Sequence, residues 1–546
     1  MWQQTIIAIS ILILPFLYNG KAAIPEFASL CFIGTVAAIL LLPKIQKSIR
    51  FSLPDLLVVL FFLWMGIGII RSNSIFPSAL LKWAALLLSY LLFRLWKPGK
   101  IVWIAIFVSG ILQAIEGENN FSNSGLRAGY LALAFLCGLG LLLATKLRKH
   151  RLTLIIGMLI IGYSLVLSDS RSAWCAVIAG ILTATILKSR TSFPAWLNNN
   201  KKTFFFIILA IALLGILLYH YKPDSANGRL FIWKIGLQMA SQHPICGGGY
   251  EYFIRNYMYA QANYFHAHPH AHEIMLADNT RYAFNEGLHL LCNWGIIGCF
   301  LMAALLCSLC RNLKSAANLI PASMLAGLLV FSCFSYPSSR LSLSMFYLLL
   351  TASIVNNSSQ QTGYTFTLPP TTQWGMRIFA MFGIIATTFL YSECRQANDL
   401  WHALRQKQTT PQELIAQTPY FIHEPEFQSR IGKACIQQKY YPETIRLLEK
   451  SAHLRPTVEM LCDLGTAYRK TGDKQKAEQC FQTAIDMIPS RMLARYRLFC
   501  LYRDNGETQK AQQTAQEILT QKAKVVNSVT LNIKQEARKY YEHINP

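Results

Sequence analysis

Long apolar runs separated by short polar segments fill the first three quarters of the chain. Each run is about 16 to 22 residues long, the length that an α-helix needs to cross the hydrocarbon core of a bilayer. The pattern predicts about thirteen membrane helices. They fall near residues 3–19, 22–42, 53–70, 76–96, 101–115, 129–145, 152–168, 172–188, 203–219, 288–310, 318–336, 340–355 and 374–391.

Lys and Arg are concentrated in alternate connections between these runs, such as 44–50, 94–100 and 146–151, whereas the intervening connections are short or acidic. Because cytoplasmic loops carry the positive charge, the N-terminus is expected inside. The first run lacks a basic leader and a cleavage site, so it reads as a membrane helix that is retained. An odd number of helices then predicts a multi-pass protein of a bacterial inner membrane with its C-terminal domain in the periplasm.

A helical repeat follows the last apolar run. Residues 457–489 place small or aromatic side chains with the spacing of the tetratricopeptide pattern, whose period is about 34 residues. The matching residues are Leu464, Gly465, Tyr468, Ala477, Phe481, Ala484 and Pro489. Weaker copies on both sides predict about three repeats, which bind peptide segments or partner proteins through a concave surface. A purely structural role, capping the periplasmic face, is the alternative.

The sequence thus predicts an all-α protein, a polytopic membrane helical bundle followed by a soluble α-solenoid. Residues 1–219 hold about nine membrane helices, and residues 288–391 hold about four more. Residues 220–287 form a large outer loop with the candidate active-site residues, and residues 392–546 form the repeat domain. A loop of this length among compact helices usually carries function.

Composition agrees with a membrane protein, since 53% of the residues are hydrophobic and only 14% are charged. The net charge of +24 lies in short segments between apolar runs, where anionic membrane lipids explain it and nucleic acid is not a partner. The 14 cysteines are scattered, many of them inside apolar runs, so they indicate neither a disulfide framework nor a zinc site.

Two arginines of the outer face are candidates for binding a diphosphate. Arg171 ends the segment SDSR at the start of a membrane helix, and Arg229 begins an amphipathic run that contains Lys234. Guanidinium groups offer paired donors to phosphate oxygens. The alternative is that both are interfacial anchors. A triple glycine at 247–249 lacks a phosphate-loop signature and is interpreted as a hinge.

The second half of the outer loop is rich in histidine. Four histidines alternate at 266, 268, 270 and 272, close to Glu273 and Asp278. Their spacing fits no standard zinc site, so a general base or an acceptor contact is favoured over a metal, with solvated loop histidines as the plain alternative. Asn285, Glu286 and His289 follow within about one turn at the start of the next membrane helix, and either of the last two can accept a proton from a hydroxyl.

These segments together resemble the O-antigen ligase family of membrane glycan transferases, over about residues 50–350. The likeness rests on SDSR, on GRLFIWK and on the stretch from Asn285 to Gly298. It implies that Arg171 and Arg229 hold the diphosphate of a polyprenyl-linked glycan and that a loop histidine activates the acceptor. Family members often carry that histidine directly before the Asn, where this chain has Phe284.

The site expected from the resemblance therefore has an open choice of base, among His289, Glu286 and His272. Asn285, Lys234 and Asp278 join the two arginines as expected substrate-binding residues. No metal or other cofactor is required, because the arginines supply the positive charge.

The fused repeats resemble the subgroup that glycosylates proteins. The leading hypothesis is transfer of an oligosaccharide from polyprenyl (undecaprenyl) diphosphate to Ser or Thr of periplasmic proteins. A ligase acting on lipid A core and an O-antigen polymerase are the alternatives within the class. A transporter lacks the expected mid-membrane charge pairs, and a tethered scaffold has no use for so many membrane helices.

Overall fold

The computed structural model describes residues 2–544 except 21, 23, 43–48, 73–75, 117–120, 122, 189–214, 216–218, 314, 359–363 and 367–368. The chain divides into two compact units. Unit 1 comprises Met1–Lys222, Ile245–Tyr250 and Phe284–Arg395, and unit 2 comprises Pro223–Pro244, Glu251–Ala283 and Gln396–Pro546. The two helices of the outer loop thus belong to the same unit as the C-terminal helices.

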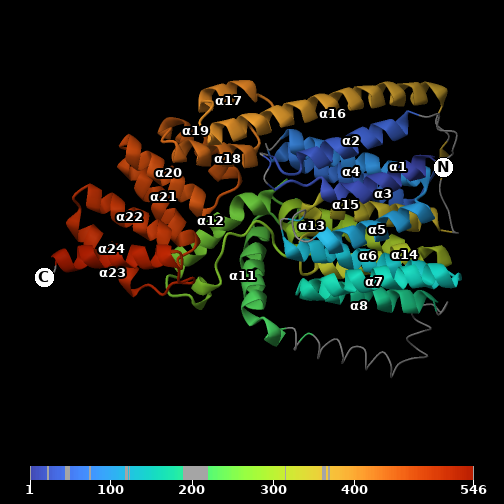
Figure 1. The fold of residues 1–546 in the computed structure, drawn as a ribbon, viewed down its shortest axis with the longest axis horizontal. Helices are drawn as coiled ribbons and strands as arrows, with labels where there is room; N and C mark the ends of the chain where they lie inside the picture. The colour runs from blue at the N-terminus through green and yellow to red at the C-terminus, as the bar shows by residue number, and fades with distance from the viewer. Residues whose placement is uncertain are drawn as a thin grey trace. The chain divides into compact units, whose positions relative to one another are not determined.

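Unit 1 is a bundle of apolar helices that pack side by side (Figure 1). Its helices are α1 (Trp2–Ile13), α2 (Phe27–Leu41), α3 (Leu53–Arg71), α4 (Pro77–Trp96), α5 (Lys100–Glu116), α6 (Ser124–Ala144), α7 (Arg148–Leu167), α8 (Arg171–Lys188), α13 (Glu286–Arg311), α14 (Leu319–Ser332), α15 (Leu341–Asn356) and α16 (Pro370–Arg405), of which α16 runs on into unit 2. Short 3₁₀ turns lie at Leu14–Phe16, Ala316–Asn318 and Pro337–Ser339. Two three-residue strands, β1 (Ile49–Phe51) and β2 (Tyr364–Phe366), pair antiparallel with Arg50 opposite Thr365.

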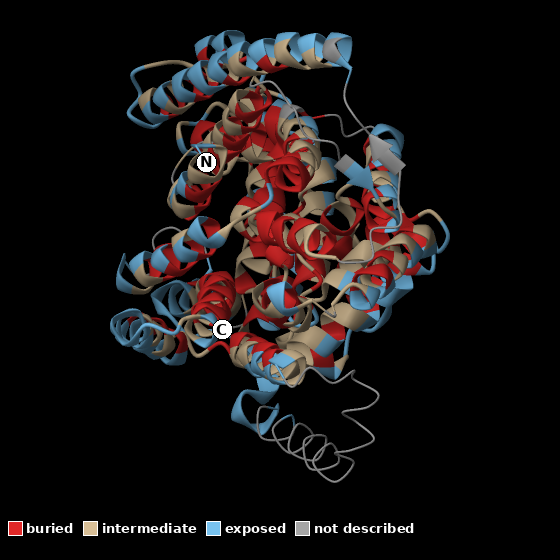
Figure 2. Cartoon of the chain, turned by 90° about the vertical axis from the view of Figure 1, so that its right-hand side faces the viewer, coloured by how far each residue is buried: buried red, intermediate tan, exposed pale blue. Residues whose placement is uncertain are grey.

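The predicted polytopic helical bundle is confirmed. Among the described residues, seven helices are long and apolar enough to cross a membrane, and four more are shorter apolar helices. Twelve of the predicted runs overlap described helices, whereas the run at 203–219 lies outside the described residues apart from Gly215 and Tyr219. Large apolar side chains also cover the outside of the bundle, for example Leu159 and Phe300, because lipid is their solvent. Figure 2 shows how buried residues gather inside the helices and exposed ones along their outer faces.

One buried pair of opposite charges joins α3 and α4. Arg94 of α4 donates from Nε to the Asp55 carboxylate of α3 at 2.6 Å, and Tyr90 donates its hydroxyl to the same carboxylate at 2.8 Å. Asp55 also accepts from the Ser52 amide at the start of α3. Breaking such a pair leaves an uncompensated buried charge, so the group holds α3 and α4 together.

Unit 2 contains the outer-loop helices α11 (Pro223–Ala240) and α12 (Tyr252–Ala267) and the short turn η2 (His272–Met275). The C-terminal helices are α17 (Pro411–Gln417), α18 (Pro425–Gln437), α19 (Tyr441–Leu454), α20 (Val458–Thr471), α21 (Lys474–Met487), α22 (Met492–Asp504), α23 (Thr508–Thr520) and α24 (Ser528–Ile544). From α18 to α23 they form three successive helix pairs, the arrangement that the repeat pattern predicts.

Glycine sets the close approach within two of these pairs. A Cβ added to Gly465 of α20 would lie 2.7 Å from the Phe481 ring of α21, and one added to Gly432 of α18 would lie 2.4 Å from Leu448 of α19. Gly472 ends α20 with a φ of 91°, a left-handed cap that favours glycine. The small residues of the repeat pattern therefore let the two helices of a pair pack closely.

Candidate active site

The SDSR segment forms the turn between α7 and α8 of unit 1. Asp169 has a φ of 52°, which residues with a Cβ rarely adopt. Its carboxylate pairs with the Lys222 ammonium, and this hydrogen bond lowers the pKa of Asp169. Arg171 donates from Nη1 to the Lys222 carbonyl oxygen at 3.4 Å. The turn thus gathers two cations and one carboxylate at the start of α8.

The start of α13 is held by side chains that the sequence singled out. Asn285 caps the helix, since its Oδ1 accepts from the Leu288 amide at 3.0 Å. The Glu286 carboxylate accepts from both the amide and the hydroxyl of Ser338, each at 2.8 Å. Lys82 of α4 donates to the Ser338 carbonyl oxygen at 3.2 Å. Asn285 therefore caps α13, and Glu286 holds this helix against the turn between α14 and α15.

His289 lies one turn further along α13. The Nδ2 of Asn293 is 3.0 Å from the Nε2 of His289. The Asn293 amide therefore orients the imidazole ring, a group that accepts a proton when it is neutral.

Phe284 occupies the position where the family resemblance places a histidine. It holds a φ of 51°, and its ring meets Tyr336 edge-on with centroids 4.9 Å apart. The side chain at this position is therefore committed to packing against the turn after α14.

The triple glycine is fixed by backbone hydrogen bonds to α13, although the sequence predicted a hinge. Helix α13 is interrupted at Gly295, where φ is 66° and ψ is −167°. The carbonyl oxygens of Cys292 and Asn293 accept instead from the amides of Gly248 and Gly249, each at 2.9 Å. The Ile297 amide donates to the Ile245 carbonyl at 3.3 Å. Non-helical backbone is tolerated within this membrane helix because the segment 245–250 supplies the hydrogen bonds that the helix lacks.

Only a glycine fits against this break. Gly247 has a φ of 68°, and a Cβ there would lie 2.4 Å from the backbone of Asn293 and Trp294. The segment 245–250 thus shapes α13 directly beside the His289–Asn293 contact.

A second polar group lies within unit 2, between α11, α12 and η2. Lys234 donates to the Tyr264 hydroxyl at 2.8 Å and to the Glu273 carboxylate at 2.9 Å. Burial alone would raise the pKa of Glu273, but the hydrogen bond from Lys234 is among the contacts that lower it overall, and the same bonds raise the pKa of Lys234. His272 lies 3.3 Å from Glu273 with its side chain 90% exposed, and His268 stacks on Tyr264.

Two other residues of the outer loop contact the repeat helices or the turns beside them. His266 lies 3.1 Å from Asp486 of α21, and Asp278 pairs with Arg491 at 2.8 Å. Asp278 thus faces the repeat helices. Within the described part of the chain, no group of three or more His, Cys, Asp or Glu side chains is placed to hold a metal ion.

Arg229 lies on α11 and is half-buried. One turn later, the Trp233 indole nitrogen donates to the Ala283 carbonyl oxygen at 2.9 Å. Arg229 and Lys234 are five residues apart on one helix, about 7.5 Å along its axis. Helix α11 therefore presents two cations in the same unit as Glu273 and His272.

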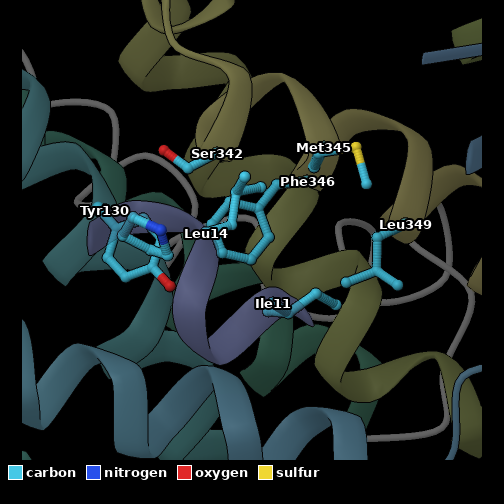
Figure 3. A pocket seen from close by; sticks show the side chains of 8 residues that line it. Ile11, Leu14, Tyr130, Ser342, Met345, Phe346 and Leu349 are labelled. Atoms are coloured by element: carbon cyan, nitrogen blue, oxygen red, sulfur yellow. The ribbon is translucent and has the colours of Figure 1, made fainter. Parts of the chain in front are cut away.

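Two small cavities of unit 1 are lined by none of these candidate residues. The first lies in unit 1 between α1, α6 and α15 and is lined mainly by Ile11, Leu14, Tyr130, Phe346 and Leu349 (Figure 3). Its volume of about 10 Å³ has room for about one water molecule. A glycan or a diphosphate does not fit there.

Comparison with known families matches both parts of the chain. Residues 156–303 match the O-antigen ligase family, and residues 458–491 match the tetratricopeptide repeat. The chain is thus similar to O-antigen ligases over residues 156–303 and carries a C-terminal tetratricopeptide repeat. No curated protein matches it significantly. The ligase match runs from α7 into α13, so it includes every candidate residue except those of the repeats.

The structure places the predicted residues in two groups. Unit 1 holds Arg171, Asn285, Glu286 and His289, and unit 2 holds Arg229, Lys234, His272 and Asp278. Two residues that sequence reasoning missed join these groups.

Lys222 is the first of them, since it contacts both Asp169 and Arg171. Ser338, the second, holds Glu286. Neither stands in a recognisable motif, because each is brought to its partner by an element about 50 residues away.

Proposed function

We propose that the protein transfers an oligosaccharide from a polyprenyl diphosphate to Ser or Thr hydroxyls of periplasmic proteins. The ligase-family match supports glycan transfer from a lipid carrier, and it covers the cationic and histidine-bearing segments. The observation that favours a protein acceptor is the repeat domain, which folds in one unit with the outer loop of the ligase region. Tetratricopeptide repeats bind peptide segments, for which a lipid acceptor has no use.

The reaction forms one bond and breaks one bond. The acceptor hydroxyl oxygen attacks the anomeric carbon of the first sugar, and the bond from that carbon to the diphosphate oxygen breaks. The hydroxyl proton passes to a base on the protein. The polyprenyl diphosphate leaves with additional negative charge, which fixed cations stabilise more strongly in the transition state than in the bound substrate.

Arg171 and Arg229 are proposed to bind the diphosphate, with Lys222 and Lys234 as the cations beside them. Arg171 lies against the Lys222 carbonyl, and Lys234 is oriented by Tyr264 and Glu273. Guanidinium offers paired donors to phosphate oxygens, and ammonium adds a point charge.

His289 is proposed as the base that takes the hydroxyl proton. The Asn293 amide nitrogen lies 3.0 Å from its Nε2 and orients the ring. Glu286 accepts two hydrogen bonds from Ser338 and is proposed to position α13. His272 remains the alternative base, because its ring is exposed and lies beside Glu273. Asn285 and Asp278 are proposed to support the site through the helix cap and the Arg491 pair.

The test compares two arginine-to-alanine variants in cells that depend on this protein for glycan transfer. R171A is expected to lower the transfer rate by at least about 100-fold, the usual cost of removing a group that stabilises transition-state charge. Arg151, exposed on the first turn of the neighbouring α7, is the matched control, and R151A is expected to transfer normally. Equal transfer by R171A and R151A, at equal amounts of membrane-inserted protein, overturns the role of Arg171.

The acceptor is identified by mass spectrometry of periplasmic proteins and of lipopolysaccharide, with and without the gene. Loss of glycan from Ser and Thr of proteins supports the proposal. Loss of glycan from lipid A core with unchanged glycoproteins assigns the protein to lipid ligation instead.

A further inference from the structure

The outer loop and the repeat helices form one packed body. Helix α12 buries one face, which includes Phe253, Tyr257 and Met258, and packs chiefly against α21. Gln261 is fully buried on this face, and its amide nitrogen donates to the Met487 carbonyl at the end of α21 at 2.6 Å. The repeats are therefore not a freely suspended module, because they share a core with the loop of the ligase region.

The segment after η2 runs without helix along this body, at residues 277–281. Asn279 uses both ends of its amide group: Nδ2 donates to Glu459 at 2.6 Å, and Oδ1 accepts from the Val458 amide at 3.2 Å. Asp278 pairs with Arg491 at 2.8 Å, and the Ala277 carbonyl accepts from Lys524 at 2.9 Å. Each residue from 277 to 279 is thus bonded to a repeat helix or its flanking turn.

These contacts fall on one edge of the repeat stack. Val458 is the first residue of α20, Arg491 directly precedes α22, and Met487 ends α21. They mark the turns that join one helix pair to the next. Asn279 therefore caps the N-terminus of α20, where the helix leaves its first amide groups without partners.

A chain of charges continues the same edge. Arg281 of the loop lies 3.3 Å from Glu426, which also accepts from Arg455 at 3.2 Å, and Arg455 reaches Glu251 before α12 at 2.9 Å. Burial alone would raise the pKa of Glu426, but Arg281, Arg455 and Arg430 lower it overall. The carboxylate is therefore ionised at neutral pH, and the loop is tied to the repeats both before α12, at Glu251, and after η2, at Arg281.

We propose that the repeat domain acts on its own chain, holding the outer loop in the conformation needed for transfer. Asn279 and its partner Glu459 are then positioning residues for the reaction, through the loop that carries Arg229, Lys234 and His272. This inference rests on the proposed function, since it concerns the loop of the same site. It also means that the edge formed by the inter-repeat turns is occupied by the chain itself, so an acceptor binds the repeats elsewhere.

The test is a double-mutant cycle on the full-length protein. N279D replaces the hydrogen bond between Asn279 and Glu459 by two carboxylates, which repel each other. E459Q keeps one donor and one acceptor at this contact. The double variant N279D/E459Q exchanges donor and acceptor across the same contact. The matched control is N505D, the same chemical change on the opposite edge, where Asn505 follows the end of α22.

We expect N279D to lower kcat at saturating acceptor by about tenfold, the double variant to recover most of this loss, and N505D to match wild type. Rates are compared at equal amounts of membrane-inserted protein with equal thermal unfolding temperatures, so that a loss in N279D does not reflect failed folding. A raised KM for the acceptor with unchanged kcat, a wild-type rate for N279D, or no recovery in the double variant each overturns the proposal. If the wild type glycosylates lipid A core and not proteins, the proposed acceptor fails, and the same cycle measured with the lipid acceptor still decides the role of the repeats.

Discussion

The close packing of Gly247 against α13 predicts how much the substitution G247A destabilises the protein. The new Cβ would lie 2.4 Å from the carbonyl carbon of Asn293 and from the amide nitrogen of Trp294. Both are backbone atoms, so no side-chain rotation relieves the overlap. The control is G162A in α7 of the same unit, where the nearest atom lies 3.7 Å away on the Phe135 ring and the backbone is helical.

The expected cost of G247A has two parts. A residue with a Cβ at a φ of 68° costs about 1 to 2 kcal/mol relative to glycine. Displacing the segment also breaks the hydrogen bonds from Gly248 to Cys292 and from Gly249 to Asn293, at about 1 kcal/mol each. The free energy of unfolding is thus expected to fall by about 3 to 4 kcal/mol, whereas G162A is expected to raise it by up to about 1 kcal/mol, the usual gain from replacing a helical glycine.

The assay is thermal unfolding of the purified protein in detergent micelles, together with the transfer rate at a temperature at which G247A remains folded. G247A is expected to unfold at a lower temperature than both wild type and G162A, and to transfer slowly because the backbone beside His289 and Asn293 has moved. If G247A unfolds at the wild-type temperature with an unchanged rate, the close packing described for this segment is refuted.

Two further predictions concern single carboxyl groups. Burial raises the pKa of Asp463 in α20 to about 6 from an ordinary 3.8, although Lys433 and Arg497 oppose the shift. Because the folded state binds the proton more tightly, stability falls as pH rises from about 4 to 6, and D463N is expected to raise the free energy of unfolding at pH 7.5 by up to about 3 kcal/mol. Denaturant unfolding at pH 4 and pH 7.5 measures this, and an equal effect of D463N at both values contradicts it. S338A removes one hydrogen bond to Glu286 and is expected to cost about 1 to 2 kcal/mol in the same assay; a wild-type midpoint would show that the bond contributes nothing.

The sequence pattern predicts the membrane helices and the repeat helices, because both depend on short-range periodicity. Apolar runs report which segments lie in lipid, so the membrane helices follow from hydropathy alone. The repeat pattern likewise encodes a local packing rule, and Gly465 against Phe481 obeys it. These features were predictable because each is set by residues within about one or two elements of one another.

The partners of the candidate site residues were not predictable in this way. Glu286 is held by Ser338, 52 residues away, and Asp278 by Arg491, 213 residues away. No local spacing carries that information, because such pairs depend on how distant helices pack. The sequence therefore identified Glu286 and Asp278 as important polar groups but gave no sign that both are engaged by distant residues.

The break in α13 shows why a polar or glycine-rich motif is hard to interpret without its partner. Taken alone, the glycines at 247–249 predict a flexible backbone, and Gly295 predicts a position that weakens an apolar helix. Together they form one rigid feature, because the amides of the first segment satisfy the carbonyls that the second leaves open. Flexibility of glycine in an unfolded chain is thus compatible with rigidity in the folded one.

Strain in the backbone points to the same segments as the chemistry. Among the described residues, six that are not glycine have positive φ, and three of these are Asp169, Glu251 and Phe284. Each such residue costs about 1 to 2 kcal/mol, so it persists only where its surroundings hold it. Asp169 is held by Lys222, Glu251 by Arg455, and Phe284 by its edge-on contact with Tyr336.

These three residues begin or end the segments that carry Arg171, α12 and the start of α13. For the proposed transfer reaction such strain, offset by specific partners, has a use, because groups already in place cost little reorganisation as charge develops on the leaving group.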